Sequence, residues 1–108
     1  MQDRPLWTPS PDRIASAAMT AFTKQVNAKH GLALGGYDEL WKWSTADLES
    51  FWTAMWDFGG VVAQARGERV LVDGDKMPGA RFFPDAKLNF AENLLGRDDD
   101  TEAIVFRG

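Results

Sequence analysis

The chain has 108 residues, of which 44% are apolar, so it is long enough to bury the core of one compact domain. It contains no cysteine, which excludes disulfides and thiolate metal sites and suits a reducing cytoplasm. A formal net charge of −4 without a basic stripe argues against nucleic-acid binding. The chain also lacks a signal-like start and a long uncharged apolar run, which predicts a cytoplasmic protein without a membrane anchor.

A helix is predicted at about residues 11–29, after an extended N-terminal arm. Ser10 is a suitable N-cap, and Pro11 fits the first helical position because its missing N–H would have no helical partner there. Gly31 is the expected stop. One apolar row runs along this predicted helix, made of Ile14, Ala18, Phe22 and Val26.

The glycines at 31–36 predict a flexible joint, and residues 37–41 a short amphipathic turn. The stretch WSTADLESFWTAMWDFGG predicts the central helix at 46–58, with Ser44 or Thr45 as its N-cap. Ala54 and Phe58 lie off its main apolar stripe. We expect the stripe residues to pack against Ile14, Phe22 and Val26. These stripe residues are Leu48, Phe51, Trp52 and Met55.

The second half reads as short pieces separated by turns. RVLVD at 69–73 predicts a brief strand, and Pro78-Gly79 the central pair of a type II turn. Asn89, with Glu92 three residues later, predicts a short helix from Phe90 to about Leu95. AIVF at 103–106 predicts a final strand, which has little to pair with in these residues. The predicted fold class is therefore mainly α, with three or four helices, a loop-rich second half and at most short strands.

No catalytic, cofactor-binding or metal-binding residue is nominated. His30 is interpreted as a surface or capping histidine, because no second ligand type lies at a useful spacing. Asp73-Gly74-Asp75 lacks the later acidic ligands of a calcium loop and is interpreted as a turn. The aspartates at 98–100 indicate a solvated loop, and no glycine-rich phosphate-binding motif is present.

Five tryptophans and seven phenylalanines are many for a chain of this length. They could form the core, an interface, or a platform for stacked bases or sugars. The helical spacing of Trp52 and Trp56 favours the core for those two. Trp43 lies off the face that we expect to bury Trp41, so it is the leading interface aromatic.

Four blocks then carry a family resemblance: PLWTPSPDRI at 5–14, WDFGGV at 56–61, MPGARFFPDAKLNFAENLL at 77–95 and AIVFRG at 103–108. In order and spacing they resemble the N-terminal region of acetoacetyl-CoA synthetases, in the adenylate-forming acyl-CoA synthetase superfamily. The third block resembles the family's WFPGARLNYAENLL. Here Phe82 replaces the tryptophan and keeps an aromatic, and Asp85 replaces the glycine, which requires that φ not be positive there. The alternative within the superfamily is an acetyl- or propionyl-CoA synthetase.

The resemblance implies a helical N-terminal domain at 1–96, followed at 97–108 by an acidic loop and the first strand of a catalytic, AMP-binding domain. It implies a parent ligase that uses ATP, Mg²⁺ and coenzyme A. This enzyme would convert acetoacetate, or another short acyl acid, through an acyl-adenylate to the acyl-CoA. The family's nucleotide loop and catalytic lysine have no counterpart in these residues, so we expect the fragment alone to be inactive.

The resemblance also suggests a partner, the catalytic domain of the same enzyme, which this region would support and partly cover. Asn89 and Asn93 would cap or hydrogen-bond a docking helix, and residues 64–88 and 96–108 would be mobile without that partner. Two alternatives remain: a free-standing helical protein-interaction module, and a small-ligand or nucleotide binder. The candidate docking residues are Trp43, Phe82, Phe83, Leu88, Asn89, Phe90, Asn93 and Leu94.

Overall fold

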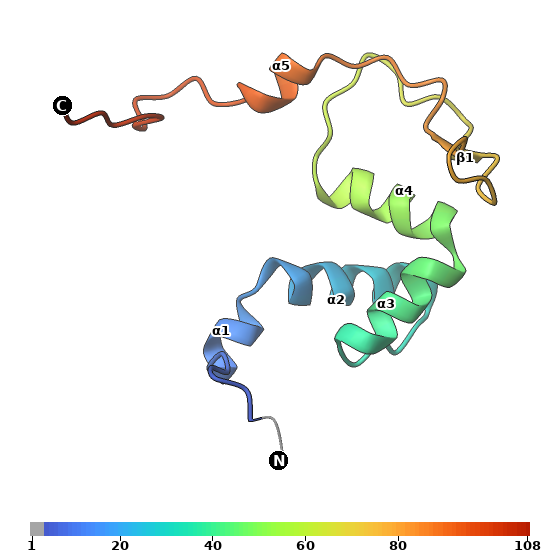
Figure 1. The fold of residues 1–108 in the computed structure, drawn as a ribbon, viewed down its shortest axis with the longest axis horizontal. Coiled ribbons are helices and arrows are strands. Elements are labelled where there is room, and N and C mark those ends of the chain that lie inside the picture. The colour runs from blue at the N-terminus through green and yellow to red at the C-terminus, as the bar shows by residue number, and fades with distance from the viewer. Residues whose placement is uncertain (1–3) are drawn as a thin grey trace. The chain divides into compact units, whose positions relative to one another are not determined.

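The computed structural model describes residues 4–108 as two compact units, the first extending to Phe58 and the second being Gly59–Gly108 (Figure 1). It is mainly helical with two short strands, as predicted, although five helices replace the expected three or four. None of the helices in residues 4–108 is long and apolar enough to cross a bilayer. The elements are α1 (Pro11–Ala15), α2 (Ala18–His30), α3 (Tyr37–Ala46), α4 (Leu48–Phe58), β1 (Leu71–Val72), β2 (Arg81–Phe82) and α5 (Phe90–Leu94).

The helix predicted at 11–29 is broken into α1 and α2. Its start is confirmed, because the Ser10 hydroxyl accepts a hydrogen bond from the Arg13 amide at 3.3 Å. The break comes at Ala17, whose backbone is extended (φ −68°, ψ 143°). The Ser16 hydroxyl donates to the Arg13 carbonyl and the Thr20 hydroxyl to the Ile14 carbonyl. Such local side-chain bonds offer the backbone an alternative to the helix, which accounts for the break.

The boundary between α3 and α4 also differs from the prediction. Ser44 and Thr45 lie inside α3, where both hydroxyls donate to the Trp41 carbonyl, so neither caps the following helix. Asp47 occupies the boundary instead, and its carboxylate accepts from the Ser50 amide at 3.1 Å. Hydrogen bonds from Ser50 lower the pKa of Asp47. A single aspartate therefore ends α3 and caps α4.

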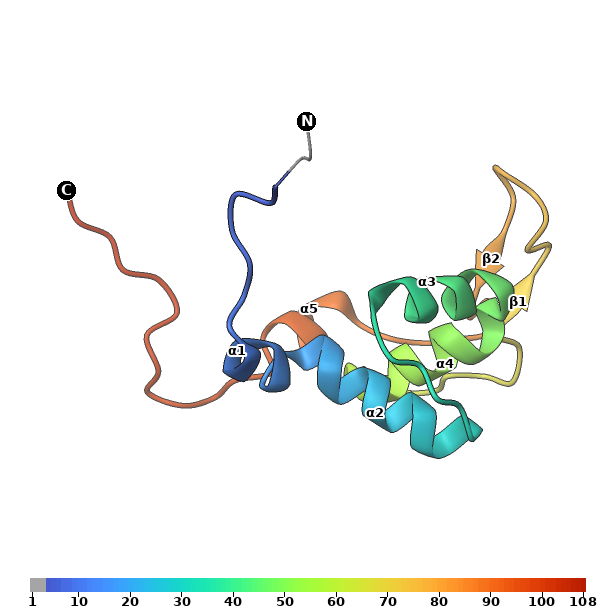
Figure 2. The same cartoon turned by 90° about the horizontal axis from the view of Figure 1, so that it is seen from below.

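The core of the first unit lies between α2, α3 and α4, which run close to one another in both views (Figures 1 and 2). The Phe22 ring is central to it, with ring centroids 5.9 Å from Phe51 and 5.3 Å from Phe58 in edge-to-face contacts. The buried residues in the described part of the chain are Phe22, Val26, Leu40 and Ala54. The half-buried residues packed on them are Leu32, Leu34, Trp43, Phe51, Met55 and Phe58.

The expected core is correct for Phe22 and Val26 but wrong for Ile14 and Trp52. These two side chains are 49% and 39% exposed. Ile14 belongs to α1, which the break separates from the helix that carries the core residues. The buried row of α4 is rotated from the expected stripe and follows an i, i+3, i+4, i+7 pattern. Its members are Phe51, Ala54, Met55 and Phe58.

Side-chain hydrogen bonds from Asn27 and Glu39 hold the expected flexible joint at 31–36, with the Gly35 amide donating to the Glu39 carboxylate. Gly31 ends α2 with φ +63°, as predicted. The Asn27 amide nitrogen then donates to the Leu34 carbonyl at 3.0 Å, and its oxygen accepts from the Leu34 amide at 2.9 Å. Two bonds to one residue fix the path of the chain between α2 and α3.

In the second unit, β1 and β2 pair antiparallel with Leu71 opposite Phe82 (Figure 2). This confirms a brief strand within 69–73. A further bridge joins Ala65 to Lys87. The Lys87 amide donates to the Ala65 carbonyl at 2.8 Å, and the Ala65 amide donates to the Lys87 carbonyl at 3.3 Å. Residues 64–88, expected to be mobile, thus form a hydrogen-bonded framework.

The predicted type II turn at Pro78-Gly79 is wrong. The Met77–Pro78 peptide is cis, and Gly79 has φ +133°. The Ala80 amide donates to the Lys76 carbonyl, one residue further back than a β-turn requires. The connection is therefore wider than the sequence pattern indicates.

The two sides of this framework approach most closely at Gly67 and Asp85. Gly67 has φ +79°, and a Cβ placed on it would lie 2.4 Å from the Asp85 Cβ, so only glycine fits. Asp85 itself has no positive φ, as its replacement of the family glycine requires. Its carboxylate accepts from Arg69 Nε at 2.9 Å and Nη2 at 2.6 Å, a two-point ion pair that links the two sides.

Replacing Asp85 by asparagine should lower the stability of this framework near neutral pH but not in acid. The Arg69 guanidinium lowers the pKa of Asp85 through its hydrogen bonds and its charge. A carboxyl whose pKa is lowered by folding stabilises above its unfolded value of about 3.9, and this contribution disappears as the pH falls through the folded pKa. The difference in urea unfolding midpoint between the unsubstituted chain and Asp85→Asn, measured at about pH 6 and about pH 2.5, tests this prediction. A gap that persists in acid would contradict the ion-pair explanation.

The second unit ends in α5 and a tail without regular structure. Asn89 is the predicted N-cap, and its Oδ1 accepts from the amides of Ala91 and Glu92 at 2.8 and 3.3 Å. The strand predicted at 103–106 is not formed among the described residues, and Ile104 and Phe106 are 90% and 89% exposed. A strand needs a neighbour to satisfy its backbone, and nothing pairs with these residues here.

Candidate functional site

The second unit has large apolar side chains but no interior. No residue of Gly59–Gly108 is buried. Phe90 and Leu94 are 77% and 68% exposed, and their i, i+4 spacing places them on one side of α5, which we call the α5 apolar face. The other exposed large apolar residues here are Val62, Met77, Phe82, Leu88, Leu95, Ile104, Val105 and Phe106. Exposed apolar groups in this number are typical of a surface that contacts protein.

One side chain joins α5 to the start of the second unit. The Asn93 Oδ1 accepts from the Val62 amide at 2.8 Å, and its Nδ2 donates to the Val62 carbonyl at 2.8 Å. The same Nδ2 donates to the Asn89 carbonyl at 2.9 Å. We call these three hydrogen bonds the Asn93 clamp. It joins residues 31 positions apart in the sequence and uses both the oxygen and the nitrogen of the Asn93 side-chain amide.

Seven of the eight predicted docking residues lie in the second unit. Phe82 and Leu88 are 44% and 49% exposed, while Phe83 is half-buried with φ +45°. Asn89 caps α5, and Asn93 forms the clamp. The docking role of these residues stays a prediction.

Trp43, the eighth, lies in the first unit. Its ring is 6.0 Å from Phe51 and 5.4 Å from His30, and it is half-buried against the core. Trp41 is 54% exposed. The reason for nominating Trp43 was therefore wrong, because α3 packs Trp43 and exposes Trp41.

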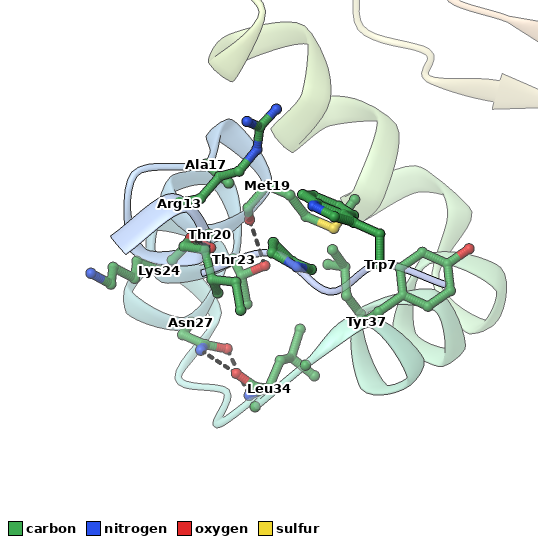
Figure 3. A pocket seen from close by; sticks show the side chains of 15 residues that line it. Trp7, Arg13, Ala17, Met19, Thr20, Thr23, Lys24, Asn27, Leu34 and Tyr37 are labelled. Carbon is green, nitrogen blue, oxygen red and sulfur yellow. Dashed lines mark hydrogen bonds between the residues drawn. The ribbon is translucent and has the colours of Figure 1, made fainter. Parts of the chain in front are cut away.

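The first unit has a pocket of about 810 Å³ between the N-terminal arm, α1, α2 and α3 (Figure 3). Trp7 and Tyr37 lie on the same side of it, and both are about two-thirds exposed, at 67% and 66%. The Arg13 guanidinium carbon is 5.6 Å from the centre of the Trp7 ring, which is a cation–π contact. Lys24 points away from both aromatic rings.

The polar groups of this pocket are largely engaged by the main chain. The hydroxyls of Thr20 and Thr23 donate to carbonyls of Ile14 and Met19, and the Asn27 amide holds Leu34. The lining contains two cations and no histidine, aspartate or glutamate. Such a lining can hold an apolar or negatively charged group, but it offers no histidine or carboxylate to act as a general acid or base.

A second, more apolar groove of about 410 Å³ lies over the core of the first unit. Tyr37 and Trp41 border it from α3, and Met19 from α2. Sequence reasoning missed it, although the i, i+4 spacing of Tyr37 and Trp41 is the signal that could have indicated an aromatic edge. The groove can receive an apolar side chain.

The residues considered for metal binding do not gather. Asp73 pairs with Lys76 at 3.3 Å, within its own turn. His30 ends α2 and lies against Trp43. No group of three histidine, aspartate or glutamate side chains in residues 4–108 could hold a metal ion.

Known sequences resemble this chain throughout. The family described as acetyl-coenzyme A synthetase N-terminus matches residues 37–94. An acetoacetyl-coenzyme A synthetase from Rhizobium meliloti (strain 1021) is 42% identical over 106 residues, and one from Rattus norvegicus is 33% identical over 110. Both alignments cover 98% of this chain and 16% of the relative. The chain thus spans about a sixth of the length of these relatives.

Two further comparisons show how widely this region is shared. A malonamoyl-CoA synthetase from Penicillium aethiopicum is 37% identical over 91 residues, which are 83% of this chain and 12% of that protein. A solved structure of acetoacetyl-CoA synthetase from Streptomyces lividans is 43% identical, with a TM-score of 0.75 over 82% of this chain and 14% of that one. The chain therefore matches the N-terminal region of acetoacetyl-CoA synthetases and belongs to the acetyl-coenzyme A synthetase N-terminus family.

Proposed function

We propose that this chain is a non-catalytic accessory region of an acetoacetyl-CoA synthetase-like ligase. The complete enzyme would convert ATP, acetoacetate and coenzyme A to acetoacetyl-CoA, AMP and diphosphate, in the cytoplasm and with Mg²⁺. High coverage by relatives named acetoacetyl-CoA synthetases supports this choice over acetyl- or propionyl-CoA synthetase. A relative named malonamoyl-CoA synthetase shares the region, which suggests that the acyl group is selected elsewhere in the enzyme.

The proposed role of the second unit is to dock on the catalytic domain. The observation that carries this is the absence of any buried residue in Gly59–Gly108, together with the exposed α5 apolar face. Burying a large apolar side chain contributes about 1.5–3 kcal/mol, so Phe90 and Leu94 would gain substantially from a partner surface. Under this proposal residues 97–108 enter the catalytic domain, where AIVF becomes the first strand of its sheet.

A free-standing interaction module would also expose apolar groups. The family match favours the ligase, because every relative compared above is a CoA synthetase several times longer than this chain. In the ligase the partner is part of the same protein. A module would bind a separate protein.

The 108-residue chain by itself should show no acetoacetate-dependent exchange between ATP and diphosphate. No histidine, aspartate or glutamate lines its larger pocket, and no metal-binding group is formed in residues 4–108. The assay is isotope exchange, with the full-length ligase under the same conditions as the positive control. Acetoacetate-dependent turnover by the chain alone would overturn the accessory role.

A further inference from the structure

We propose that Asn93 is the positioning residue for docking: its clamp holds α5 so that Phe90 and Leu94 face the partner before contact is made. The inference rests on the proposed docking function and adds the residue that prepares the surface. Asn93 itself need not touch the catalytic domain.

Packing cannot fix the orientation of α5 within the second unit. The helix has five residues, none of them buried, and a helix this short is not stable on its own in water. Asn89 caps its start, but this bond is internal to the segment 89–92. The Asn93 clamp is different, because it reaches both backbone groups of Val62 at 2.8 Å. It therefore links α5 to a segment 31 residues earlier.

A prepared surface binds more tightly because less order has to be created on contact. Asn93 lies beside the α5 apolar face, three residues after Phe90 and one before Leu94, so the clamp sets the direction in which that face points. In the undocked chain Asn93 is exposed and water competes for its hydrogen bonds. Docking of the adjacent α5 apolar face would reduce the access of water to these hydrogen bonds and strengthen them. The clamp should therefore matter more for docking than for the stability of the undocked chain.

Two isosteric substitutions one helical turn apart test this in the full-length ligase. Asn93→Asp removes the Nδ2 donor and turns a carboxylate toward the carbonyls of Val62 and Asn89. Asn89→Asp makes the same change in charge but keeps the oxygen that caps α5, and aspartate is an equally good N-cap. The first should increase hydrogen exchange at the α5 amides about tenfold or more, while the second should change it less than about twofold.

The pH dependence separates positioning from general damage. A carboxyl facing two carbonyl oxygens has a raised pKa and, once protonated, donates a hydrogen bond again. The increase in α5 hydrogen exchange caused by Asn93→Asp, measured relative to Asn89→Asp, should therefore become smaller as the pH falls from about 7.5 to about 5. Should Asn93→Asp fail to fold, Asn93→Ala removes the amide without adding charge and should still increase exchange.

The outcomes are distinct. Protection at α5 that is equal in Asn93→Asp, Asn93→Ala and Asn89→Asp would overturn the positioning role. The substitution Phe90→Asp tests docking itself. If exchange at the α5 amides increases in Phe90→Asp but not in the Asn93 variants, the proposed docking function stands and only the positioning role of the clamp is rejected. If exchange is unchanged in all four variants, both the docking function and the positioning role are rejected.

Discussion

Replacement of Phe22 by alanine is expected to destabilise the first unit by roughly 3–5 kcal/mol. Phe22 is 3% exposed, and its ring meets those of Phe51 and Phe58 edge to face. Each such ring pair adds about 0.5–1.5 kcal/mol beyond the buried area. Since a whole domain is stable by only about 5–15 kcal/mol, we expect most of the cooperative unfolding transition to be lost at room temperature.

The control for this prediction is Met19→Ala on the same helix. Met19 is 52% exposed, so its truncation should cost clearly less than that of Phe22. Urea unfolding followed by far-ultraviolet circular dichroism measures both. Trp52→Ala should also fall below Phe22→Ala, because Trp52 is 39% exposed. Equal losses at Phe22 and Met19 would mean that the core is not centred on Phe22.

In the full-length ligase, Phe90→Asp is expected to reduce acetoacetate activation about tenfold or more, through weaker docking of this region. Phe90 is 77% exposed in this chain, so any large loss must come from a surface that covers it in the complete enzyme. It is also the first residue of α5, where a negative charge favours the helix. Damage to α5 itself is therefore an unsuitable explanation for a loss.

Met77→Asp is the matched control, because Met77 is 99% exposed in the same unit but lies outside α5 and is not one of the eight candidate docking residues. Exchange between ATP and diphosphate gives the activity, and hydrogen exchange at residues 90–95 gives the docking. Both should change in Phe90→Asp and neither in Met77→Asp. Normal α5 protection and activity in Phe90→Asp would reject docking through this face.

The helix ends were the most predictable part of this fold. The stops and caps at Ser10, Gly31 and Asn89 follow from hydrogen bonds between neighbours in sequence or from a positive φ, which the local residue types indicate. Asp47 shows the limit of this reasoning. Its neighbours Ser44 and Thr45 are equally good N-caps by type, and the choice depends on how far α3 extends.

The face that each helix buries could not be derived in the same way. The apolar residues of α4 cover more than one side, and the small Ala54, which lies off the expected stripe, is 4% exposed. Its burial depends on the position of α2 and α3, which periodicity within α4 does not contain. For the same reason the prediction buried Trp41 and exposed Trp43, whereas α3 packs Trp43 on the core and exposes Trp41.

For the candidate site, the sequence indicated the α5 segment but not its attachment. The prediction that Asn93 makes hydrogen bonds did not identify its partner. That partner, Val62, is 31 residues away and contributes only backbone atoms. Backbone partners leave no residue-type signal. The equivalent bonds from Asn27 to Leu34 were missed for this reason.

The bare tail after α5 has a consequence for handling the protein. Ile104, Val105 and Phe106 form a β-prone apolar run at least 74% exposed, next to acidic residues at 98–100 and 102. These negative charges repel a second copy of the chain and so oppose pairing between the apolar tails of two copies as neighbouring strands. Acid or high salt weakens this repulsion, so fibrillar self-association of the 108-residue chain should begin at its C-terminal end under those conditions.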